Sequence, residues 1–142
     1  MSEFKQPVSV LVVIHTADNN VLLLERAKHP GFWQSVTGSR EGDESLLLAA
    51  QREVAEETGI VAPVEAFRDW RLSNRFEIFM KWRQRYAPGV THNTEHVFSL
   101  QLPAQCEVKL APDEHVASVW LPQVQAATAC FSWTNRDAIL ML

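Results

Sequence analysis

Residues 38–60 read GSREGDESLLLAAQREVAEETGI, and the interpretation of the whole chain begins with this stretch. Asp43 is a residue type that caps helices, Glu44 suits a first helical turn, and Gly59 can end a helix in a left-handed conformation. Together these positions predict one helix over residues 44–58, which the chain enters from a glycine-bearing loop.

The predicted helix has acidic side chains on the same side as its apolar residues. At about 100° per residue, Glu53 and Glu57 fall in line with the aliphatic stripe, and Glu56 lies at its border. Adjacent carboxylates repel each other and resist desolvation, and a hard divalent cation removes both costs. Oxygen-only ligands favour Mg²⁺, with Mn²⁺ as a substitute, over Zn²⁺. A solvated acidic helix with ordinary ion pairs fits less well, because lysine partners are absent.

The stretch resembles the Nudix box, the motif of hydrolases that act on a nucleoside diphosphate linked to another group. Every fixed position of that box is present between Gly38 and Ile60. The resemblance implies an α+β domain with the Nudix fold, an α/β/α sandwich around a central mixed β-sheet. It also implies a Mg²⁺-dependent hydrolase with Glu53 and Glu57 among its metal ligands.

Four further stretches narrow the resemblance to one branch of this family. Residues 32–39, 76–79, 85–95 and 132–136 read FWQSVTGS, FEIF, RYAPGVTHNTE and SWTNR. They are similar to the Nudix enzymes of bacterial folate synthesis, which hydrolyse 7,8-dihydroneopterin triphosphate to the monophosphate and pyrophosphate. Thr134 stands where a serine is expected in that branch.

The same resemblance implies which residues form the site. It adds Glu114, in the loop 112–115, to the helix carboxylates as a metal ligand. The residues that it implies for substrate binding are Lys5, Arg26, Thr37, Ser132 and the segment Phe76, Glu77, Ile78 and Phe79.

Hydrolysis of a triphosphate requires charge neutralisation and a proton acceptor. Mg²⁺ held by Glu53, Glu56 and Glu57 can bridge phosphoryl oxygens and lower the pKa of a bound water. Glu114 is the candidate general base because it lies on a separate loop, and Glu56 is the rival. The predicted catalytic residues are therefore Glu56, Glu57 and Glu114.

Alternating residues predict a strand over 74–82 that bears on base recognition. Phe76, Ile78 and Met80 share one face of this strand, so Glu77 leaves by the other. A carboxylate there can accept hydrogen bonds from the ring N–H and the 2-amino group of a pterin, an edge that guanine shares. The alternative is a strand glutamate that faces water.

The rest of the chain fits a single domain over residues 1–142. The composition is 46% hydrophobic and 21% charged, an ordinary balance for a globular protein. Further strands are predicted at residues 8–14, 21–26, 60–67, 94–102 and 116–121, and helices at 123–129 and 135–142. The five histidines, His115 among them, show no metal-ligand spacing and are predicted to be structural or surface residues.

Composition and the motifs together bound the function. A net charge of −4 argues against nucleic acids and anionic membranes as partners, and leaves a small-molecule triphosphate. Without a long apolar run or signal peptide, the expected location is the cytoplasm. A general (d)NTP pyrophosphatase is the nearest alternative, because pterin and guanine share the 2-amino-4-oxo edge. A Nudix-fold binding domain is a third hypothesis, against which the intact box argues. The sequence leaves the oligomeric state open.

Overall fold

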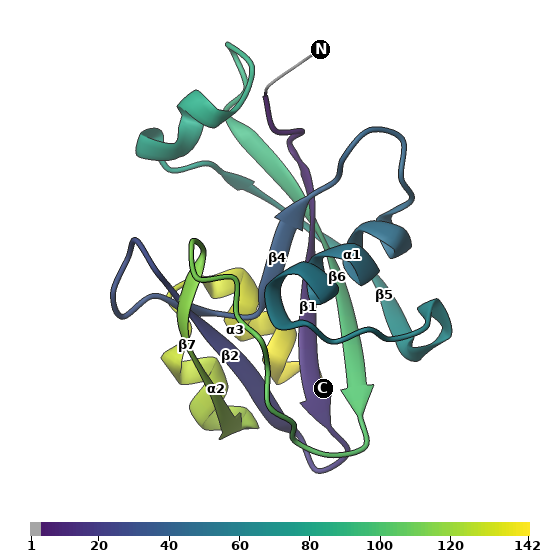
Figure 1. The fold of residues 1–142 in the computed structure, drawn as a ribbon. Helices are drawn as coiled ribbons and strands as arrows, with labels where there is room; N and C mark the ends of the chain where they lie inside the picture. The colour runs from purple at the N-terminus through teal and green to yellow at the C-terminus, as the bar shows by residue number, and fades with distance from the viewer. Residues whose placement is uncertain (1–3) are drawn as a thin grey trace.

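The computed structural model describes residues 4–142, and seven strands of this part form one mixed sheet (Figure 1). Neighbouring strands follow the order β3-β2-β1-β6-β5, with β4 paired to β1 and β7 paired to β2. β1 is parallel to β6 and antiparallel to β2 and β4. The strands are β1 Val8–Thr16, β2 Asn20–Arg26, β3 Trp33–Gln34, β4 Val36–Ser39, β5 Phe67–Glu77, β6 His92–Leu102 and β7 His115–Pro122.

Helices cover both faces of the sheet (Figure 1). β1 is central because both of its faces are apolar: Val10 and Val12 pack in the core with α1, whereas Leu11 and Val13 pack in the core with α2 and α3. The predicted α/β/α sandwich is thus confirmed. The helical segments are α1 Leu46–Thr58, η1 Val64–Ala66, η2 Met80–Arg85, α2 Gln123–Ala129 and α3 Trp133–Leu140. None of the helices within residues 4–142 is long and apolar enough to cross a membrane.

α1 begins later than the sequence predicts. Its N-cap is Ser45, whose hydroxyl accepts a hydrogen bond from a backbone N–H in the first turn, so Asp43 is not the cap. Glu44 lies outside the helix, and its carboxylate pairs with Arg52 at 2.6 Å. The predicted end is correct: Gly59 has a φ of 75°, the left-handed conformation that favours glycine.

Two predicted strands are wrong in part. The segment 60–67 contains the short 3₁₀ helix η1 in place of a strand, and β5 begins only at Phe67. Pro63 precedes η1 and has no N–H to donate to a sheet. At the other end β5 stops at Glu77, where the pairing with β6 ends, so the strand predicted over 74–82 turns into η2. The other predicted elements are confirmed to within two residues at each end.

Candidate metal and substrate site

A groove of about 1350 Å³ runs past the glycine-bearing loop of residues 38–42, from α1 to the N-terminus of α3. It collects residues from all seven strands and from several loops. Every residue predicted for the site lines this groove except Glu57, which is buried beside it. The structure therefore brings together residues that lie far apart in the sequence.

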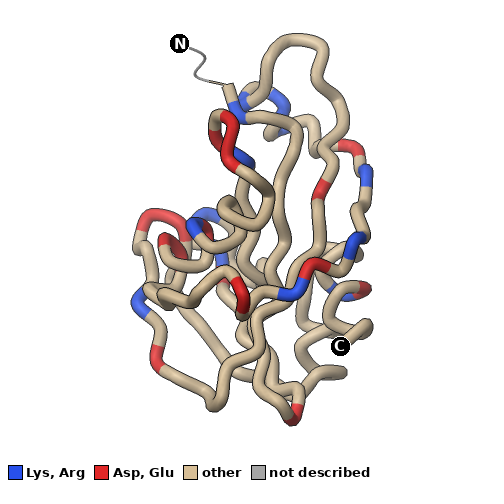
Figure 2. The backbone as a smooth tube through the Cα atoms, turned by 90° about the vertical axis from the view of Figure 1, so that its right-hand side faces the viewer, with Lys and Arg blue, Asp and Glu red and all other residues tan. Residues whose placement is uncertain are grey.

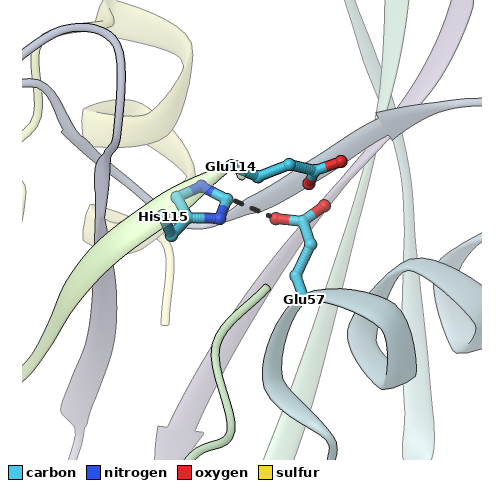
Figure 3. A group of neighbouring side chains, drawn as sticks. All are labelled: Glu57, Glu114 and His115. Carbon is cyan, nitrogen blue, oxygen red and sulfur yellow. Dashed lines mark ion pairs between the residues drawn. The ribbon is translucent and has the colours of Figure 1, made fainter. Parts of the chain in front are cut away.

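The metal end of the groove, defined by Glu53, Glu56, Glu57, Glu114 and His115, contains a cluster of carboxylates. In Figure 3 the Glu57 side chain extends from the end of α1 toward Glu114 and His115, which lie where β7 begins. One ligand atom from each of these three residues lies within 4.8 Å of the others. Glu57 is only 1% exposed, and neither of its carboxylate oxygens has a hydrogen-bond partner among the described residues. Buried oxygens without donors fit a bound cation.

The raised pKa values of Glu57 and Glu53 also fit a bound cation. Burial raises the pKa of Glu57 well above its ordinary value, and the neighbouring Glu53, Glu114 and Glu56 raise it further. Burial also raises the pKa of Glu53, although Arg52 acts in the opposite direction. A divalent cation would stabilise the ionised forms and lower both pKa values.

Gly38 and Arg52 hold Glu53 in place. A Cβ atom at Gly38 would overlap the carboxylate of Glu53, so only glycine allows this close approach. The Arg52 guanidinium donates to Glu53 at 2.7 Å, to Glu44 at 2.6 Å and to the backbone oxygen of Ser39 at 3.0 Å. These bonds connect the loop to α1 and orient one member of the acidic cluster.

Glu56 and Glu114 are the exposed members of the metal end. The Glu56 side chain is 55% exposed and pairs with Arg52 at 3.2 Å. Glu114 is exposed on the turn before β7, and its backbone oxygen accepts a hydrogen bond from Ala27 at 2.8 Å. That bond connects the turn to the end of β2, beside Arg26.

His115 belongs to the cluster, although its spacing in the sequence did not indicate this. Its Nε2 atom lies 3.9 Å from a Glu57 oxygen and 3.4 Å from Gln34 Nε2. Burial, and then Arg26, lowers the pKa of His115 to about 4, so the ring is neutral at pH 7 and can accept at nitrogen. The only sequence feature that could have indicated that His115 lies in this cluster is its position directly after Glu114.

Basic residues border the groove next to the acids. Burial, followed by repulsion from Arg85, lowers the pKa of Lys5, while Glu53 acts in the opposite direction. Arg26 stacks on the Trp82 ring at 4.8 Å from its centroid. Along the chain as a whole, basic and acidic residues are interspersed (Figure 2). The folded chain nevertheless gathers the cations Lys5, Arg26 and Arg85 in the groove. Cations that repel one another are suited to binding a polyanion.

The segment after β5 forms the rim of the groove. Ile78 is 3% exposed, whereas Phe79 is 53% exposed and contacts the Trp82 ring. The Glu77 side chain is 69% exposed, and its carboxylate pairs with Arg83 at 3.0 Å. Glu77 thus lies at the rim, in contact with water.

The base end of the groove, defined by Ser9, Thr37, Asn93, Glu95 and Thr134, is polar, and all of these residues except the half-buried Thr37 are buried. Burial raises the pKa of Glu95 to about 7, against the effect of the Thr134 and Thr37 hydroxyls. Ser132 shares a hydrogen bond of 2.9 Å with Thr134, so the residue that departs from the expected serine still supplies a hydroxyl there. Sequence reasoning missed Glu95, because a single glutamate in an alternating strand is not distinctive.

The model of the NUDIX domain matches residues 5–141. The chain belongs to the Nudix family. This Nudix hydrolase is 48% identical over 139 residues to the dihydroneopterin triphosphate diphosphatase of Escherichia coli K12, across 96% of this chain and 91% of that protein. The protein of the same name from Haemophilus influenzae is 40% identical over 142 residues, across 98% of this chain and 89% of that protein.

A solved structure confirms the fold of this Nudix hydrolase. The E. coli dihydroneopterin triphosphate pyrophosphohydrolase superposes with a TM-score of 0.92 at 46% identity, across 99% of this chain and 97% of that chain. Nudix hydrolases generally use divalent metals, and Glu57, Glu114 and His115 form a possible metal-binding cluster in this one.

Proposed function

We propose that this Nudix hydrolase converts 7,8-dihydroneopterin triphosphate to the monophosphate and pyrophosphate with Mg²⁺, a step of folate biosynthesis. The observation that carries the proposal is the groove itself, which connects a carboxylate cluster, a group of cations and a buried polar pocket. The names of relatives that are 48% and 40% identical support the choice of substrate. A general (d)NTP pyrophosphatase is not favoured, since those relatives match nearly the full chain.

Glu53, Glu56, Glu57 and Glu114 would hold Mg²⁺, or Mn²⁺ as a substitute. The bound ion would supply charge neutralisation at the phosphoryl oxygens and a more acidic water. Glu57 contributes two oxygens that lack any other partner among the described residues, and Arg52 keeps Glu53 directed toward the loop. His115 is neutral at pH 7 and adds no like charge beside the cations that bind phosphate.

Glu114 is proposed as the general base. It is exposed beside the buried Glu57, so it can accept a proton from water and release it to the solvent. Glu56, the rival, is held in an ion pair with Arg52 at 3.2 Å and is not part of the cluster of Glu57, Glu114 and His115. The geometry therefore supports Glu114 over Glu56 in this role.

The remaining predicted residues would bind the substrate. Lys5 and Arg26 lie next to the acids and are assigned to the triphosphate, where a polyanion relieves their mutual repulsion with Arg85. The organic part of the substrate is assigned to the rest of the groove, with the contacts Thr37, Phe76, Glu77, Ile78, Phe79 and Ser132.

A substrate panel tests this function. Pyrophosphate release from dihydroneopterin triphosphate, dGTP, dATP and dCTP is measured at saturating Mg²⁺ and ranked by kcat/KM. We expect the pterin triphosphate to rank first by about 10-fold or more, since one well-placed polar contact discriminates at this level or above. An equal ranking would indicate a general (d)NTP pyrophosphatase. No release from any of the four would indicate a binding domain.

A further inference from the structure

Glu95 is a buried acid that the metal end does not explain. It lies in β6 opposite Ser9 of β1, and it is 4% exposed. Its Oε2 atom accepts a long hydrogen bond of 3.5 Å from the Thr37 hydroxyl, and its Oε1 atom has no partner among residues 4–142. Leaving a buried acceptor unpaired is costly, so a ligand that supplies donors would relieve the cost.

The charged cluster of the groove lies elsewhere. Val97, the next residue of β6 on the same face, packs in the core with α2 and α3, so Glu95 faces away from α1 and its carboxylates. Burial raises the pKa of Glu95, and the hydroxyls of Thr134 in α3 and Thr37 in β4 lower it. No charged group of the described residues is among the causes of this shift. The Tyr86 phenol, after η2, is a titratable group near Glu95: burial is the main cause of its raised pKa, and the Glu95 charge raises this pKa further.

A second orphaned acceptor lies two residues away on the same face of β6. Asn93 is 5% exposed, and its Nδ2 atom donates to Ser9 at 2.8 Å, which leaves its Oδ1 atom without a partner among the described residues. Asn93 and Glu95 both line the groove, together with Ile78 and Phe131, which supply apolar surface. The base end thus presents two open acceptors on one face of β6, in a groove that also has apolar side chains, an arrangement that suits a flat heterocycle with donors on one edge.

From this geometry we propose that Glu95 is the residue that determines which base the site accepts. Its carboxylate accepts hydrogen bonds from a ring N–H and the neighbouring amino group, and Asn93 Oδ1 accepts from the remaining amino hydrogen. Pterin and guanine carry this donor pair, whereas adenine and cytosine do not. The inference deepens the proposed function, because it names the group that would recognise the base of that substrate. The exposed Glu77, paired with Arg83, is left at the rim.

Glu95→Gln is the direct test, because it keeps the shape of the side chain and replaces one acceptor by a donor. For dihydroneopterin triphosphate and dGTP we expect KM to rise about 10- to 100-fold, because a donor would then face a donor. For dATP and dCTP, KM changes less than about threefold. In the wild type, KM for the pterin falls as the pH rises from 6 to 8, because Glu95 ionises near pH 7. That dependence is absent in Glu95→Gln.

Two comparison variants and a binding measurement complete the test. Glu65→Gln, at an exposed glutamate of η1, is the matched control and leaves all four KM values unchanged. Glu95→Asp keeps the acceptors one methylene further back, and its KM for the pterin lies between those of wild type and Glu95→Gln. Calorimetric titration with 7,8-dihydroneopterin, which carries no phosphate, reports the base end without metal or turnover; Glu95→Gln weakens this binding.

The outcomes separate this inference from the proposed function. An equal rise of KM on all four substrates, or no rise on any, overturns the role of Glu95. Should wild type release pyrophosphate from dGTP and dATP but not from the pterin triphosphate, the proposed substrate is wrong. The contrast between dGTP and dATP in Glu95→Gln would still decide the role of Glu95. Turnover of dATP by the same preparation shows that the variant is folded.

Discussion

The metal end and the base end of the groove both contain a buried glutamate, but the neighbours of the two side chains differ. Glu57 is 1% exposed and Glu95 is 4% exposed, and burial is the first cause of the raised pKa in each. Other carboxylates raise the pKa of Glu57 further, whereas the hydroxyls near Glu95 lower its pKa.

The comparison shows that neighbours determine what a buried acid can bind. A group of like charges without donors is stabilised by a cation, because only a cation offsets both repulsion and desolvation. An isolated carboxylate among hydroxyls is stabilised by hydrogen-bond donors. In the proposed function, one residue type would thus serve two chemistries within one groove.

The largest expected effect concerns the metal end. Glu57→Gln and Glu53→Gln should each lower kcat about 1000-fold or more at saturating Mg²⁺, because the amide keeps the shape but removes the ligand charge. Pyrophosphate release measures the effect, with Glu65→Gln as the control. Near-wild-type kcat in either variant would contradict the comparison between the two ends, because catalysis would then not depend on the negative charge of the carboxylate cluster.

A smaller effect is expected at Glu114. Glu114→Gln should lower kcat about 100-fold, change KM little and flatten the acidic limb of the pH–rate profile, because general-base catalysis contributes at this level. Recovery of the rate with high Mg²⁺ or with Mn²⁺ would show that Glu114 is mainly a ligand. An unchanged rate and pH profile would remove Glu114 from the metal end.

The smallest effect is on stability, at the base end. The pKa of Glu95 is raised from 4.5 to about 7 on folding, so the folded state is penalised once Glu95 ionises. The contribution of Glu95 to the free energy of unfolding is therefore fully present below pH 4.5, where the side chain is neutral in both states. This contribution is lost as the pH rises through about 7.

Glu95→Gln should therefore stabilise the metal-free protein at pH 8.5, by at most about 3 kcal/mol, and leave it unchanged at pH 4. Thermal unfolding at the two pH values measures the difference. An equal Tm for wild type and variant at pH 8.5 would show that Glu95 is already satisfied without a ligand. The comparison between the two ends would then fail.

Much of the fold was predictable because its decisive patterns are local. The acids of α1 share a face with its apolar residues at a spacing of three to four residues, and Glu53 and Glu57 are accordingly buried. The predictions failed where local rules competed. Ser45 is the N-cap although Asp43 is also a capping residue type, and Glu44 between them pairs with Arg52. The alternation of Phe76 and Ile78 did not continue as a strand, because β6 begins at His92, opposite Glu77, and the chain turns into η2 after a last hydrogen bond from Ile78 N–H to the Thr91 oxygen.

The sequence by itself determined the family, the box helix and the acids on its apolar face, since these depend on residues close together in the chain. The tertiary structure decided that His115 joins Glu57 and that Glu95 faces Thr37, 58 residues away. Both contacts require strands from separate parts of the chain to pair, β7 with β2 and β6 with β1. Burial and the charge of the neighbours, which set the chemistry of each acid, exist only after that pairing.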